Sequence, residues 1–358
     1  MKRALVLSGG GAKGSFQVGA LKSILSNDEK KLDFHIIKGV SVGALNGAIL
    51  AQAKLDADPV TSWENLKAQY DVLRSIWDGI KGNDDIYHTQ VLAEIRLGFD
   101  LNSLYTREPL EALVIKYIDE TKLQNSGRKF TAGVVSLPSG NYTEFGTDRP
   151  AGPATRQMIL ASTAIPDVFP IVDTGSDVLV DGGVRNITPL AAVYEDLRNL
   201  RKETGDTDPN PDEIHVVLTN KTTLDADGVP DQSDVPNQDY KTEWKNNWLG
   251  TKVNGIKVLG RSVDIVCDQI MIDDLRTAVD WNFVAKGINQ AKSVMKEKDF
   301  EALDKTLHNK RFVKLFVYYP TEFYGCDNKN DDTNFSGTFI QHALLHGELR
   351  GTLPAVYE

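Results

Sequence analysis

The chain has 358 residues, 41% of them hydrophobic and 25% charged, which is ordinary for a globular protein with a large buried core. Its net charge of −10 argues against nucleic acid as the main partner, because phosphate binding needs a basic face. Its two cysteines, Cys267 and Cys326, form no disulfide framework and no C-x-x-C metal site, which favours a reducing compartment.

Alternating apolar runs and helix-forming segments follow one another along the chain. We expect strands at residues 4–7, 34–37, 130–137, 142–145, 178–180, 214–218 and 312–318. We expect helices at residues 16–25, 44–51, 63–80, 110–118, 154–165, 189–201, 255–297 and 337–351. This alternation predicts an α/β layer fold with a mostly parallel sheet. The apolar run at 4–7 is too short for a signal peptide, and no run is long enough to predict a transmembrane segment.

We expect a single domain over residues 1–358, with a core that carries the motifs at about 3–200. Residues 206–240 hold nine acidic residues against one lysine, with several prolines and asparagines, so we expect an acidic surface insertion at about 206–250. Residues 255–358 would close the domain.

The first motif is Gly39-Val40-Ser41-Val42-Gly43, placed between an expected strand and an expected helix. A serine at the apex of such a turn is crowded and exposed, and the two glycines remove side chains that would clash with it. The helix that follows points its N-terminal amides at the same place, which favours developing negative charge. This motif predicts that Ser41 is a nucleophile.

A second glycine-rich turn, Ser8 to Ser15, also joins a strand to a helix. The amides of Gly10 and Gly11, with no side chains in the way, could stabilise a tetrahedral oxyanion. Gly9 and Gly14 complete this loop, and Lys13 could face a negatively charged head group.

The third turn is Asp181-Gly182-Gly183, after a short buried strand. Asp181 could take a proton directly from Ser41, provided that hydrogen bonds orient its carboxylate. If all three strands run parallel, their carboxyl ends place the three turns around one crevice. These residues predict acyl transfer from an ester.

Two other interpretations remain. The spacing of Gly9, Gly11 and Gly14 is that of the dinucleotide fingerprint, but no acidic residue stands at the end of the second strand, where the ribose would need one. A Ser-His-Asp triad is also possible by chain order, with a histidine chosen from His215, His308, His342 and His346.

With these motifs in hand, the sequence resembles the patatin-like phospholipases over about residues 3–200. The residues 9–14 resemble that family's oxyanion loop, with lysine where many members have arginine, and residues 39–46 resemble its nucleophile elbow. Ala161 to Pro166, running on to Pro170, resembles its central block, and Asp181 to Pro189 resembles the segment with its catalytic aspartate.

The resemblance implies a three-layer α/β/α sandwich similar to the catalytic core of cytosolic phospholipase A2. It implies a Ser-Asp acyl hydrolase, a phospholipase A or lysophospholipase that needs no histidine, metal or other cofactor. The expected substrate is an acyl lipid at a membrane or micelle surface, and the expected location is the cytoplasm with peripheral contact to membranes. The alternatives are a serine esterase or acyltransferase on other esters, and an idle α/β module that binds a nucleotide or a partner protein.

Overall fold

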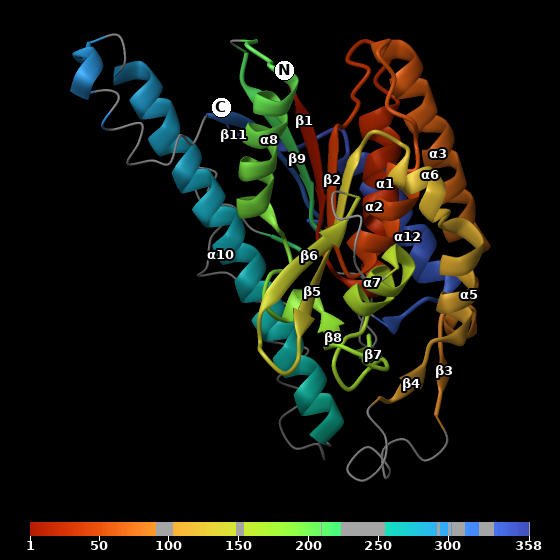
Figure 1. Cartoon of the computed structure of the whole chain (residues 1–358). Coiled ribbons are helices and arrows are strands. Elements are labelled where there is room, and N and C mark those ends of the chain that lie inside the picture. Colours follow the sequence, from red (N-terminus) through yellow and green to blue (C-terminus); the bar gives the residue numbers. More distant parts are fainter. Residues whose placement is uncertain are drawn as a thin grey trace.

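The computed structural model describes residues 1–90, 103–147, 154–208, 210–222, 255–291, 294–299, 302, 312–321 and 333–357. A central sheet lies between two layers of helices, as Figure 1 shows. Its strands are β1 (Arg3–Leu7), β2 (Ile36–Val40), β5 (Lys129–Ser136), β6 (Tyr142–Gly146), β7 (Val172–Asp173), β8 (Val178–Asp181), β9 (Asp212–Val217), β10 (Val313–Tyr318) and β11 (Ala355–Tyr357). A separate two-stranded ribbon joins β3 (His88–Thr89) to β4 (Tyr105–Thr106).

The helices divide between the two faces of the sheet. They are α1 (Gly14–Leu25), α2 (Val42–Ala51), α3 (Pro59–Gly79), α5 (Glu108–Tyr117), α6 (Glu120–Gln124), α7 (Thr155–Ser162), α8 (Leu190–Thr204), α10 (Gly255–Ala291) and α12 (Gly337–Arg350), with 3-10 turns η1 (Gly11–Lys13), η2 (Asn83–Asp85) and η3 (Gly182–Val184). Helices α1, α2, α3, α5 and α12 contribute to the core on one face. Helices α8 and α10 contribute to the core on the other face. The predicted three-layer α/β/α fold is confirmed.

The sheet is mixed, with a parallel centre. Strands β10, β9, β1, β2 and β5 lie side by side and run parallel, whereas β11, β6, β8 and β7 join by antiparallel pairings. Alternating residues of the central strands enter the two cores: Leu5 and Leu7 face one core, and Ala4 and Val6 face the other. Burial on both faces explains why these strands read as continuous apolar runs.

Strand β2 is shifted toward the C-terminus relative to the strand expected at residues 34–37. The run begins at Phe34, but the strand spans Ile36–Val40 and therefore ends immediately before Ser41. Gly39, expected in the turn, is paired with Leu7 of β1 and with Ala132 of β5. Glycine weakens the interior of a strand, but pairing with strands on both sides keeps the backbone extended at Gly39.

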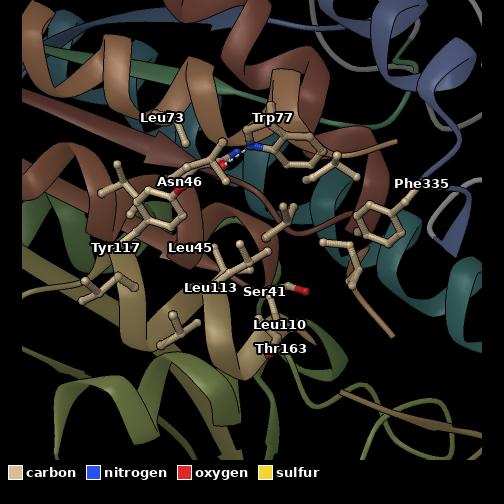
Figure 2. Close-up of a pocket in the computed structure, with 18 of the residues that line it drawn as sticks. Ser41, Leu45, Asn46, Leu73, Trp77, Leu110, Leu113, Tyr117, Thr163 and Phe335 are labelled. Carbon is tan, nitrogen blue, oxygen red and sulfur yellow. Dashed lines mark hydrogen bonds between the residues drawn. The ribbon is translucent and has the colours of Figure 1, made fainter. Parts of the chain in front are cut away.

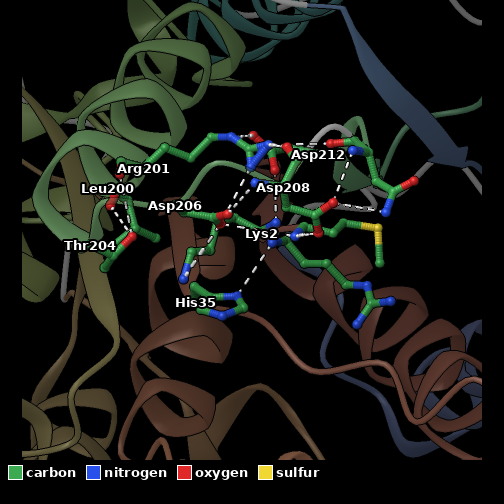
Figure 3. A network of polar contacts seen from close by, with 11 residues as sticks. Lys2, His35, Leu200, Arg201, Thr204, Asp206, Asp208 and Asp212 are labelled. Atoms are coloured by element: carbon green, nitrogen blue, oxygen red, sulfur yellow. Dashed lines mark hydrogen bonds and ion pairs between the residues drawn. The ribbon is translucent and has the colours of Figure 1, made fainter.

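The expectation of a surface insertion over residues 206–250 is wrong for residues 212–217, which form a buried strand. Strand β9 lies inside residues 206–250 and pairs with β1 and β10 at the centre of the sheet. The acidic residues before it form a structural network, in which the guanidinium of Arg201 lies 3.3 Å from Asp206 and 3.3 Å from Asp212 (Figure 3). Asp212 also accepts the backbone amide of Lys2 at 2.7 Å. Residues 223–254 lie outside the described part of the chain.

Helix α8 is attached to the sheet by buried charges. The ammonium of Lys38, on β2, lies 2.6 Å from Asp196 of α8, and that of Lys129, on β5, lies 2.7 Å from the same carboxylate. Lys38 also contacts Glu144 of β6. The lysines and carboxylates pair with one another between the sheet and α8, which offsets the cost of burying charge.

Candidate active site

Ser41 has a strained backbone between β2 and α2. Its φ of 55° and ψ of −127° are values that non-glycine residues rarely adopt. Ser41 is only 6% exposed, and its carbonyl accepts the amide of Ala44 at 2.9 Å in the first turn of α2. A strained residue that the surroundings hold in place is characteristic of a functional turn.

Close backbone approach explains the two glycines that flank Ser41. A Cβ on Gly39 would collide with the carbonyl of Gly43, and a Cβ on Gly43 would collide with the carbonyl of Leu7 in β1. The backbone on the two sides of Ser41 is thus in close contact, and it also contacts the neighbouring strand β1. No other residue fits at either position without moving backbone atoms.

Asp181 is the last residue of β8 and is 3% exposed. Its Oδ1 accepts the amide of Gly183 at 2.7 Å, which fixes the orientation of the carboxylate. Its own amide donates to the carbonyl of Ala164 at 2.9 Å. A Cβ on Gly182 would lie 2.5 Å from the carbonyl oxygen of Gly133, so this turn is packed against β5.

The strand register brings Ser41 and Asp181 to one point. Gly133 of β5 pairs with Val40 on one edge and with Glu144 of β6 on the other, and the next residue, Val134, pairs with Asp181 and with Thr143 of β6. A strand has only two edges. Since β6 occupies one of them, β2 and β8 share the other and meet end to end.

The expected parallel orientation of β8 is therefore wrong, although its carboxyl end still lies next to the end of β2. Strand β8 runs antiparallel to β5, so the end that carries Asp181 faces the end of β2. Val40 and Asp181 pair with consecutive residues of β5, which are about 3.3 Å apart along a strand. The turn with Ser41 and the strand end with Asp181 come together because two strands converge, and a shared parallel direction is not needed.

Residues 162–164 connect the two ends. The Oγ of Ser162 accepts the amide of Ser41 at 2.9 Å and donates to the carbonyl of Gly133 at 2.7 Å. Two residues later, the carbonyl of Ala164 accepts the amide of Asp181. One short segment after α7 thus holds both the serine turn and the aspartate strand.

The glycine-rich loop after β1 lies over Ser41. A Cβ on Gly9 would lie 3.3 Å from the Cβ of Ser41, and the amide of Gly9 donates to the carbonyl of Ile187 at 3.2 Å. Gly10 has φ 145° and Gly11 has φ 51°. Within the described part of the chain, the amides of Gly10 and Gly11 donate to no protein carbonyl. Two backbone amides without a carbonyl acceptor in the protein are able to donate hydrogen bonds to a ligand.

Gly14 and Lys13 have different surroundings from those loop glycines. Gly14 begins α1, where a Cβ would collide with the side chain of Val42, next to Ser41. The ammonium of Lys13 donates to Asn220, which in turn donates to Asp268 of α10. Lys13 does not line the cavity described next.

A cavity with about 780 Å³ of empty space, counting its open mouth, begins at Ser41 and Gly11 (Figure 2). Its walls come largely from α2, α3 and α5, and Thr163, Ile165, Phe169 and Phe335 also line it. The apolar residues of the helical walls are Val42, Leu45, Ile49, Leu73, Ile76, Trp77, Leu110, Leu113, Val114 and Tyr117. An apolar cavity that a serine lines at one end suits an apolar substrate group.

Asn46 is a polar residue in the wall of this cavity, and its side chain makes its hydrogen bonds within the protein. Its Nδ2 donates to the carbonyl of Gly14 at 3.2 Å and to Gln17 at 3.0 Å. Its Oδ1 accepts the indole N–H of Trp77 at 2.9 Å, as Figure 2 shows. This amide joins α1, α2 and α3 and leaves the cavity surface apolar.

The described histidines have other environments. His215 is buried in β9, with Nδ1 3.0 Å from the hydroxyl of Tyr318, and burial lowers its pKa. His346 of α12 contacts Thr321 and Phe16. None of His35, His88, His215, His342 and His346 lines the cavity at Ser41. His308 lies outside the described residues.

Sequence reasoning missed three contributions to this site. Ser162 was noticed only as part of the block that resembles the family, and nothing in a lone serine predicts a bond to residue 41. Asn46 followed the elbow, but its partners are 29 to 32 positions away in both directions. Asp274, described below, lies on a helix whose expected periodicity shows only packing.

Comparisons with known proteins agree with the motifs. The family model described as patatin-like phospholipase matches residues 5–194. A lysophospholipase nte1 of Aspergillus terreus is 28% identical over 188 residues, which is 51% of this chain and 10% of that protein, so the chain spans about a tenth of the relative's length. VipD of Legionella pneumophila covers 98% of this chain with 66% of its own, at 12% identity and a TM-score of 0.37. Because the family model matches more than half of the residues, the chain belongs to the patatin-like phospholipase family.

Proposed function

We propose that the protein hydrolyses the carboxylic ester of an acyl lipid, with Ser41 as nucleophile and Asp181 as general base. The observation that carries this proposal is the convergence of β2 and β8 on consecutive residues of β5. Membership of a phospholipase family supports a lipid substrate.

In the first half of the reaction, the Oγ of Ser41 attacks the carbonyl carbon and its proton passes to the Asp181 carboxylate. The amides of Gly10 and Gly11, with the first turn of α2, stabilise the oxyanion. Collapse of the tetrahedral intermediate breaks the ester bond. The alcohol, which carries the head group, leaves with the proton from Asp181, and the acyl group remains on Ser41.

In the second half, water attacks the acyl carbon and gives its proton to Asp181. A second tetrahedral intermediate collapses, and Ser41 regains its proton as the fatty acid leaves. Ester and water thus become acid and alcohol, with Ser41 and Asp181 restored. No step in this scheme needs a histidine, a metal or another cofactor.

The cavity supports a single acyl chain as the group bound beside Ser41. Ser41, Leu45 and Ile49 follow one another at four-residue steps along α2, which places Ile49 about 12 Å from Ser41 along the helix axis. The walls along this length are apolar and the polar Asn46 is satisfied internally. One cavity for one chain favours a lysophospholipid or a similar single-chain ester, which is also consistent with the name of the curated relative.

The described helices also bear on how the protein meets lipid. None of them is both long enough and apolar enough to cross a membrane. We propose that substrate comes from a membrane or micelle surface by peripheral contact, with the protein located in the cytoplasm.

The decisive experiment compares Ser41→Ala with wild-type protein on mixed lysophospholipids and phospholipids, with the products identified by mass spectrometry. We expect at least about a thousandfold loss of fatty acid release, because the covalent step is removed. Ser75→Ala, at an exposed serine of α3, is the matched control and should keep full activity.

Two results separate the alternatives. A fluorophosphonate that labels wild-type protein and not Ser41→Ala supports the assignment, whereas a folded wild-type protein that is never labelled favours the idle module. Release of acyl groups from non-lipid esters alone, or their transfer to an added alcohol in preference to water, favours the esterase or acyltransferase.

A further inference from the structure

Helix α10 lies outside the residues that the family model matches, yet it contacts both loops of the active site. The Sγ of Cys267 lies 3.5 Å from the carbonyl of Gly183, in the aspartate turn. Asp268 accepts the side-chain amide of Asn220, which in turn accepts the ammonium of Lys13 in the loop after β1. Figure 1 shows α10 alongside the face of the sheet that also carries α8.

The closest tie runs through Asp274. The oxygen and nitrogen of the Asn186 side-chain amide are assigned from its surroundings, which offer only acceptors on one side. In the orientation that satisfies them, its nitrogen donates to Oδ2 of Asp274 at 3.1 Å and to the carbonyl of Thr188 at 3.3 Å. The backbone amide of Thr188 also donates to the Asp274 carboxylate. Two donors from the segment 186–188 therefore converge on one carboxylate of α10.

Segment 186–188 lies between the two loops that the reaction uses. The amide of Asn186 donates to the carbonyl of Gly182 at 2.9 Å, next to Asp181. The carbonyl of Ile187 accepts the amide of Gly9 at 3.2 Å, at the start of the oxyanion loop. Its side chain also fills the space beside Gly9 and Gly183. A shift of this segment would therefore move the base and the oxyanion donors together.

We infer that Asp274 is a positioning residue, which holds residues 186–188 so that Asp181 and the oxyanion loop keep their alignment with Ser41. The inference rests on the proposed function. It adds a residue that lies 80 positions beyond the matched family region and that touches no reacting atom.

The electrostatics agree with a role other than stability. Burial, with a smaller effect of the Asp273 charge, raises the pKa of Asp274 to about 7 against the lowering effect of the Thr188 amide. Tyr142 is buried nearby, and its pKa is raised by burial, by Glu144, and also by Asp274 and Asp181. A partly buried carboxylate among other acids is costly to keep, and replacing it with a neutral residue can stabilise a protein.

The test is Asp274→Asn, measured on a single-chain lysophospholipid together with thermal unfolding. An asparagine at this position turns an N–H towards the donating amide of Asn186, so the segment loses one of its two ties. We expect kcat to fall about tenfold with KM within twofold, and Tm to stay unchanged or rise. Asp280→Asn, at an exposed aspartate of the same helix, should keep wild-type kcat and Tm.

A swapped pair completes the test. In Asp274→Asn with Asn186→Asp, the amide and the carboxylate exchange places, and the pair regains a donor and an acceptor. A carboxylate at position 186 cannot donate to the carbonyl of Thr188, so the recovery is partial. We expect kcat to recover at least threefold over the single variant. An unchanged kcat in Asp274→Asn overturns the inference, and so does a fall in kcat that accompanies a lower Tm and is not rescued by the swap.

Failure here is distinguishable from failure of the proposed function. If Ser41→Ala abolishes hydrolysis while Asp274→Asn does not change it, only the positioning role is rejected. If Ser41→Ala keeps its activity, the nucleophile assignment itself is rejected.

Discussion

Ser41 and Asp181 reach the same point of the sheet from opposite directions. Strand β2 ends at Val40, opposite Gly133 of β5, and β8 ends at Asp181, opposite the next residue, Val134. Both strands use the edge of β5 that β6 leaves open. Two strands that meet end to end thus bring the serine turn, which lines the apolar cavity, next to the strand end that carries Asp181.

Asp181→Asn should lower kcat by about 10² to 10⁴-fold, the range that a positioned general base contributes. Asparagine keeps an oxygen for the amide of Gly183, so the turn and the thermal stability should be preserved. The measurement is steady-state hydrolysis of a lysophospholipid, with circular dichroism to verify the fold. A folded variant with more than a tenth of wild-type kcat would contradict the role of Asp181.

The same assay can be applied to the four histidines of the triad alternative. Replacing His215, His308, His342 and His346 with glutamine should leave hydrolysis in place if the protein remains folded. Because His215 is buried in the core, its replacement is best made separately from the other three. Loss of activity in any folded histidine variant, to the level of Ser41→Ala, would favour the triad.

Ser162→Ala should reduce both stability and activity. It leaves the Ser41 amide and the Gly133 carbonyl without their partner, and an unsatisfied buried group costs about 1–3 kcal/mol. Because one of those groups belongs to the nucleophile, we expect kcat to fall about tenfold. Chemical denaturation and steady-state kinetics measure the two effects.

Ser126→Ala is the matched control for that variant. Ser126 is also a buried serine that joins a carbonyl to an amide, those of Leu123 and Arg128, but it lies before β5, away from the cavity. It should lose similar stability and no activity. An equal fall in kcat for both variants would show that Ser162 acts only through stability.

Ile49→Trp should shorten the acyl chain that the enzyme prefers. Ile49 is two helical turns beyond Ser41 on α2, in the wall of the cavity, and a larger side chain there removes space far from the reaction. Excluding about two methylenes from burial costs roughly 1.6 kcal/mol, so kcat/KM for long acyl esters should fall about tenfold.

Short acyl esters provide the comparison for that variant. They do not reach Ile49, so their kcat/KM should stay within twofold of wild type. A uniform loss across all chain lengths would instead mean that the substitution disturbs the serine turn, and Tm would then fall as well.

The stability of the fold should decrease as the pH falls from about 6.5 to 4. Burial, with the charges of Lys2, Arg128 and Arg3, lowers the pKa of His35 to about 4, against the opposing effect of Asp33. In that pH range the unfolded chain binds a proton at His35 and the folded protein does not, so lowering the pH favours unfolding. The Nδ1 of His35 accepts the amide of Arg3 at 3.3 Å, a bond that protonation would break.

His35→Gln isolates this contribution, which amounts to at most about 3 kcal/mol for a shift of this size. Denaturant unfolding at pH 7 and at pH 4.5 gives the two free energies. The difference between them should be smaller in the variant than in wild type. An identical difference would show that His35 does not titrate as its surroundings suggest, and that His215 or other groups carry the acid sensitivity.

The sequence alone determined the layered fold and the family. Apolar runs of four to eight residues became central strands because a parallel sheet is buried on both faces, and helical periodicity predicted α1, α3, α5 and α8. Local motifs indicated Ser41 and Asp181 as candidate site residues, because each lies in a glycine-rich turn after a strand and resembles a motif of the family. The short pieces β3, β4, β7, β11 and α6 were not predicted, since two to five residues carry too little pattern.

Only the tertiary structure decided how these residues meet. The direction of β8 depends on which edge of β5 is open, and that depends on the β5–β6 hairpin, so no local pattern encodes it. The ties through Ser162, Asn46 and Asp274 join positions 29 to 121 residues apart. Such contacts depend on strand register and helix packing between distant segments, and no local pattern in the sequence shows which distant segments will meet.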